Sequence, residues 1–88
     1  MNATLEDWKN GWFGVRLSMS PAEIDRLIAL LQYLKVDPDQ HFHITSDYAG
    51  SGGLGDIEVS IQEPSQPHNL RLGSLALGRG GTVTDGRA

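Results

Sequence analysis

The residues whose types and spacing most resemble those of a chemical site are two histidines and the glycines of one loop. They lie in the stretch HFHITSDYAGSGGLGDIEVSIQ, where His41 and His43 are two residues apart and Gly50-x-Gly52-x-x-Gly55 follows. On a strand, residues two apart project from the same face, so both imidazoles can bind one metal ion. The glycines share their spacing with a dinucleotide-binding fingerprint. Which chemistry is available depends on the elements that carry these residues.

The glycine pattern predicts a hairpin loop rather than a nucleotide site. A dinucleotide-binding loop must open a helix, whose N-terminus holds the pyrophosphate. Here the loop leads into Asp56-Ile-Glu-Val-Ser-Ile-Gln, whose apolar residues recur at every second position as on a strand. No Lys-Ser or Lys-Thr follows the glycines, which argues against a P-loop. We therefore expect a mobile loop whose glycines adopt positive φ, and no cofactor.

The histidine pair alone does not define a metal site. A zinc site needs at least three protein ligands, and only His41 and His43 are linked by spacing. Asp47 and the distant His68 are candidates for a third ligand. The favoured interpretation is two solvated histidines on a polar strand face, with no metal assigned.

Catalysis is not indicated elsewhere in the sequence. There is no cysteine and no Gly-x-Ser-x-Gly motif, and Ser46-Asp47 beside His43 is close in sequence without a defined geometry. No pair among the 11 carboxylates is singled out by its spacing. We therefore predict that the protein is not an enzyme.

The charge balance and hydropathy exclude further classes of function. The 88 residues carry a net charge of -4 and their basic residues are scattered, whereas phosphate binding uses clustered Lys and Arg. No apolar run approaches the ~20 residues that span a bilayer, and the N-terminus lacks the features of a signal peptide. We expect a cytoplasmic protein that binds neither nucleic acid nor membrane.

A capped helix is the element with the most local signals. Ser20, Pro21 and Glu23 form a capping box with proline at the first helical position. Apolar residues at helical spacing follow, and Pro38 predicts that the helix ends near residues 34–36. Leu27 and Leu31 lie within this apolar stripe.

We expect truncation of Leu27 or Leu31 to alanine to cost roughly 2–5 kcal/mol. This expectation requires that a sheet covers the apolar stripe of the helix.

The order of the elements predicts an α+β fold. Alternating residues predict strands over 12–19, 41–45 and 57–62, and a further strand opens at Leu70 and reaches Leu77. We predict one helix packed on one face of a mostly antiparallel sheet of three to four strands, in the order β-α-β-β-β.

The predicted domain occupies residues 12–77. Residues 1–11 are expected to form a mobile arm or a short edge strand, because Asn10-Gly11 favours a type I′ turn. Residues 78–88 are expected to form a disordered tail.

The open face of the predicted sheet is the expected binding surface. It combines aromatic, histidine and charged side chains, as protein contact surfaces often do, and the adjoining loop adds to it. The residues expected to contact a partner are Trp12, Arg16, His41, His43, Asp47, Tyr48, Asp56 and Glu58. The alternative interpretation is a solvated face of an antiparallel sheet.

The helix start Ser-Pro-x-Glu-Ile-x-x-Leu-Ile-x-x-Leu is followed by His-Phe-His-Ile-Thr-Ser-Asp and a glycine-containing loop. With these features, residues 12–62 resemble small immunity proteins of bacterial polymorphic toxin systems. The loop here is longer than the Trp-Gly-Gly-like loop of those proteins and lacks its Trp. The resemblance implies a cofactor-free domain that binds and neutralises a cognate toxin, and acidic charge suits a basic toxin site. The alternative is a small homodimeric regulatory, ligand-binding or metal-binding module that uses the His41/His43 strand.

Overall fold

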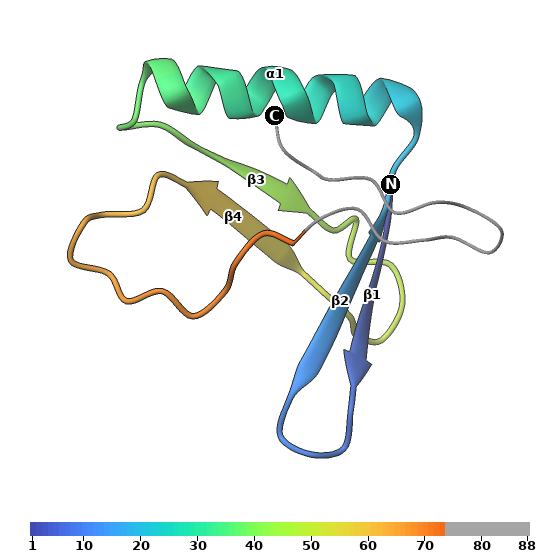
Figure 1. Ribbon diagram of the computed structural model, residues 1–88. Helices are drawn as coiled ribbons and strands as arrows, with labels where there is room; N and C mark the ends of the chain where they lie inside the picture. Colours follow the sequence, from blue (N-terminus) through green and yellow to red (C-terminus); the bar gives the residue numbers. More distant parts are fainter. Residues whose placement is uncertain (74–88) are drawn as a thin grey trace, which may run out of the picture.

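The computed structural model describes residues 1–73, which form one helix and four strands (Figure 1). The elements are β1 (Asn2–Asp7), β2 (Phe13–Ser18), α1 (Pro21–Val36), β3 (His41–Thr45) and β4 (Asp56–Ser60). The strands pair as two separate two-stranded antiparallel sheets, β1–β2 and β3–β4. The α+β class is confirmed, whereas the single sheet and the order β-α-β-β-β are wrong, since the order is β-β-α-β-β.

The β1–β2 hairpin shows that part of residues 1–11 is a strand. Its register places Leu5 opposite Val15 on one face, while Arg16 on the other face forms an ion pair with Glu6 at 3.0 Å. The expected type I′ turn is not formed. That turn needs positive φ at both central residues, but around the tip only Lys9 and Gly11 have it, with φ of 62° and 92°.

Helix α1 begins as the capping box predicts. The Glu23 N–H donates to Ser20 Oγ at 3.2 Å, and the Ser20 N–H donates to Glu23 Oε1 at 3.0 Å. The N-terminal amine of Met1 donates to Glu23 Oε2 at 2.9 Å. The Ser20 N–H and then this amine stabilise the charged carboxylate, so the pKa of Glu23 falls from 4.5 to about 2.

The core of the described residues is small. Leu34 is their one buried apolar side chain, with 4% of its surface exposed. The helix positions Ile24, Ile28 and Leu31 are 44%, 48% and 43% exposed, so this part of the apolar stripe is left largely uncovered. The large loss of stability expected on truncation of Leu31 is therefore corrected to a smaller one. A large loss of stability is expected on truncation of Leu34 instead.

The β3–β4 hairpin follows the helix, and the apolar and polar residues of the hairpin lie on opposite faces. Figure 1 shows β3 between α1 and β4. Phe42, Ile44, Ile57 and Val59 alternate along the strands and are half-buried, and the polar residues between them are exposed. The alternation predicted from sequence is confirmed for both strands.

The chain beyond β4 does not form the expected strand where it is described. Residues 61–73 contain no strand, and Leu70 and Leu72 are 89% and 102% exposed. The rest of that expected strand, through residue 77, and the expected tail at 78–88 lie outside the described residues. Within residues 1–73, no helix has the length and apolar character to cross a membrane.

Candidate functional site

The polar face of the β3–β4 hairpin brings two histidines and two carboxylates together. His41, His43 and Thr45 share this face because they alternate along β3. The antiparallel register places Glu58 opposite His43 and Asp56 opposite Thr45. We call His41, His43, Asp56 and Glu58 the histidine–carboxylate cluster.

Asp56 fixes one side of the His43 ring. His43 Nδ1 lies 2.9 Å from Asp56 Oδ2 and 3.1 Å from Oδ1, and the Thr45 hydroxyl donates to Oδ1 at 3.2 Å. An ionised carboxylate only accepts hydrogen bonds, so Nδ1 must carry a proton. In the neutral ring, Nε2 is therefore the nitrogen with a free lone pair.

Glu58 approaches the Nε2 atoms of both imidazole rings. Its Oε1 is 3.7 Å from His43 Nε2 and 3.8 Å from His41 Nε2. The rings themselves meet edge to face, with centroids 5.0 Å apart. Both distances to Oε1 exceed a hydrogen bond, so the three groups converge without direct hydrogen bonding among them.

This cluster is the place where the described residues could hold a metal ion. One ligand atom from each of His41, His43 and Glu58 lies within 4.8 Å of the other two. The candidates from spacing, Asp47 and His68, are not part of this group. Sequence alone treated Glu58 only as a partner contact, since its place opposite His43 depends on the register of the hairpin.

Trp12 and Arg16 do not share a sheet with the histidines. Both belong to the β1–β2 hairpin and its tip, and Trp12 is 72% exposed. The single open face predicted to carry Trp12, Arg16, His41, His43 and Glu58 is therefore divided between two separate sheets.

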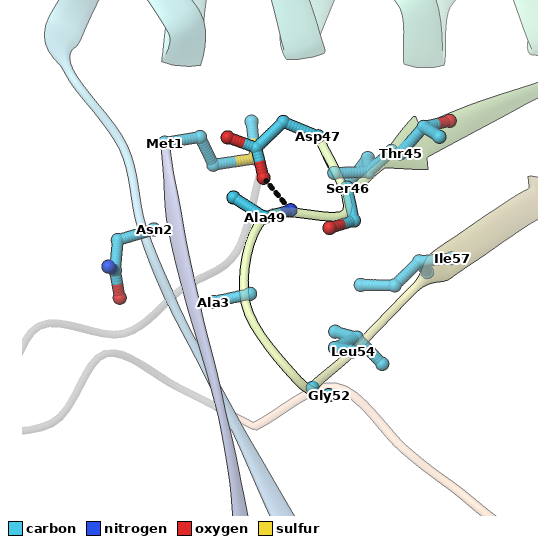
Figure 2. Close-up of a pocket in the computed structure, with 12 residues that line it drawn as sticks. Met1, Asn2, Ala3, Thr45, Ser46, Asp47, Ala49, Gly52, Leu54 and Ile57 are labelled. Atoms are coloured by element: carbon cyan, nitrogen blue, oxygen red, sulfur yellow. Dashed lines mark hydrogen bonds between the residues drawn. The ribbon is translucent and has the colours of Figure 1, made fainter.

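The loop between β3 and β4 contains Asp47 and Tyr48. The Ala49 N–H donates to Asp47 Oδ1 at 3.1 Å, as Figure 2 shows. Gly50 and Gly53 have positive φ, as expected for glycines of this loop, whereas Gly52 and Gly55 do not. The loop leads directly into β4 rather than into a helix, so the structure lacks the helix N-terminus that a dinucleotide-binding loop requires.

A cavity of about 520 Å³ lies between this loop and the start of β1 (Figure 2). Its lining includes Met1, Ala3, Leu54 and Ile57, and Asp47 is its one side chain that ionises. Asn2, Thr45 and Ser46 add polar side chains to this lining, and no residue of the histidine–carboxylate cluster lines the cavity.

The β1–β2 hairpin has an exposed apolar face. Leu5, Phe13 and Val15 are 47%, 57% and 54% exposed, and we call them the apolar hairpin face. They lie on one side because Leu5 pairs with Val15 and Phe13 pairs with Asp7 in the antiparallel register.

No protein-family model matches the chain, and no curated protein or solved structure matches it significantly.

Proposed function

We propose that the protein is a non-enzymatic protein-binding domain and that the apolar hairpin face is part of its contact surface. The observation that carries this proposal is the exposure of Leu5, Phe13 and Val15 on one face of a two-stranded sheet. A contiguous exposed apolar patch marks an interaction site more often than scattered apolar residues do. An isolated two-stranded hairpin is also marginally stable in water, and a partner that covers this face would stabilise it.

An exposed aromatic side chain next to the apolar hairpin face suits a protein contact. Trp12 precedes Phe13 at the tip of the hairpin and is 72% exposed. Aromatic side chains are enriched at protein contact surfaces.

The partner class in this proposal is a toxin domain. The resemblance of residues 12–62 to immunity proteins supports it, and so does the net charge of -4, which would attract a basic toxin surface and speed association. The competing partner is a second copy of the chain, in which case the protein is a homodimeric module.

Affinity capture from the native host tests the proposal. The full chain should retain a partner, Phe13→Lys should lose it, and Val36→Lys should retain it. Val36 is a matched control because it is an apolar residue that is 84% exposed on α1, away from the hairpin. Capture of nothing by the wild type, or equal capture by both variants, would overturn the proposal.

Sedimentation velocity separates the two partner classes. A monomer supports a face reserved for a different protein. A dimer that Phe13→Lys dissociates would show that the partner is a second copy of the chain.

A further inference from the structure

We propose that His41, His43 and Glu58 form a binding site for one divalent transition-metal ion of the zinc class, with Asp56 as a positioning residue. This inference is independent of the proposed protein contact, since the cluster and the apolar hairpin face lie on separate sheets.

Two of the three ligand-atom distances are close to the edges of a tetrahedral site, and the third, between the ligand atoms of His41 and His43, is at most 4.8 Å. With zinc–nitrogen and zinc–oxygen bonds of about 2.0–2.2 Å, the edge of a ligand tetrahedron is about 3.4 Å. Glu58 Oε1 lies 3.7 Å from Nε2 of His43 and 3.8 Å from Nε2 of His41. A metal ion therefore requires each of these distances to shorten by only a few tenths of an ångström, which exposed side chains can do by small rotations.

Asp56 prepares His43 for coordination. Metal-bound histidines usually donate their other ring N–H to a carboxylate or carbonyl, which fixes the tautomer and the ring orientation. The contacts of Asp56 with His43 Nδ1, at 2.9 and 3.1 Å, meet this requirement, and the Thr45 hydroxyl in turn holds Asp56. His43 Nε2 is thus left facing Glu58.

The arrangement of His41, His43 and Glu58 fits a bound metal ion better than two ion pairs between the histidines and Glu58. For both rings to pair with Glu58 as cations, two positive imidazoliums would have to converge on one carboxylate oxygen. As metal ligands the rings are neutral, and one carboxylate then offsets part of the charge of a divalent ion. The fourth position of such a site faces solvent, because the side chains of His41, His43 and Glu58 are 53%, 42% and 56% exposed.

The donor set indicates the class of metal. Imidazole suits zinc, copper, iron and nickel, whereas magnesium and calcium prefer sites built from oxygen ligands. Zinc and nickel should therefore bind, while magnesium and calcium should not.

Isothermal titration of the metal-stripped full chain with ZnCl₂ tests the site. We expect one ion per chain, loss of binding in His41→Ala, His43→Ala and Glu58→Gln, and no response to MgCl₂ or CaCl₂. His68→Ala and Glu63→Gln are matched controls that should bind like the wild type, because neither residue belongs to the cluster. The exposed ligands can be replaced with little effect on folding, which circular dichroism verifies.

Asp56→Asn tests the positioning role. Affinity for zinc should fall about 10–100-fold, while the melting temperature of the metal-free protein stays unchanged. Cobalt binding gives a second readout, since tetrahedral Co²⁺ absorbs visible light much more strongly than the hexaaqua ion. Absence of zinc binding in the wild type, equal binding by the ligand variants, or one ion per two chains would overturn the proposed site. Unchanged zinc affinity and cobalt absorption in Asp56→Asn would overturn the role of Asp56.

Discussion

Replacement of Leu34 by alanine should destabilise the protein far more than replacement of Leu31. Leu34 is 4% exposed, so its truncation removes buried methyl groups and leaves a cavity, at a cost of roughly 2–5 kcal/mol. Leu31 is 43% exposed and retains much of its contact with water. Full burial of a leucine side chain contributes about 1.5–3 kcal/mol, so a half-covered one contributes about 1 kcal/mol.

The two costs differ enough to be measured in a domain of this size. Globular proteins have about 0.05–0.15 kcal/mol of stability per residue, which gives about 4–13 kcal/mol for a chain of this length. Leu34→Ala therefore removes a large share of the total, whereas Leu31→Ala removes a small one.

Urea denaturation followed by circular dichroism at 222 nm gives the free energy of unfolding for each variant. We expect Leu34→Ala to lower the midpoint strongly and Leu31→Ala to lower it slightly. Equal losses, or a larger loss for Leu31→Ala, would refute the description of α1 as a helix whose apolar stripe is covered mainly at Leu34.

Two further predictions concern local interactions. Glu23→Gln should lower the melting temperature above pH 4.5. The difference from wild type should shrink as pH falls from 4.5 towards about 2, because the pKa of Glu23 is depressed in the folded protein and protonation removes the stability that the charged carboxylate contributes. A difference independent of pH would show that the charge of Glu23 is unimportant. Gly50→Ala should destabilise the loop by about 1–2 kcal/mol, since its φ of 90° strains any side chain. Gly52→Ala should be nearly neutral in thermal melts, because a Cβ there meets nothing within 4 Å.

The helix and the β3–β4 strands could be predicted from sequence because their signals are local. The capping box from Ser20 to Glu23 acts within one turn, and the alternation of His41 to Thr45 is a property of a single strand. Each of these signals predicts a helix or a strand without information from the rest of the chain.

The sheet arrangement could not be predicted because strand pairing is a long-range choice. β2 has the alternation that a strand in any sheet requires, but its partner is β1, whose residues include only two apolar side chains, Ala3 and Leu5. The sequence pattern therefore placed β2 in the sheet that contains β3.

The candidate site was predictable only in part for the same reason. The shared face of His41 and His43 follows from the two-residue period of a strand. The approach of Glu58 and Asp56 depends on the register across the hairpin, which the long glycine loop leaves open at the level of sequence.

Covalent footprinting of the β1–β2 hairpin tests the central claim most directly. The account predicts that Phe13 and Val15, which are 57% and 54% exposed, label strongly in the isolated full chain and become protected when the captured partner is bound. Protection of both residues in an isolated monomer would mean that the chain covers this face itself, and it would contradict the assignment of the apolar hairpin face as a protein contact surface.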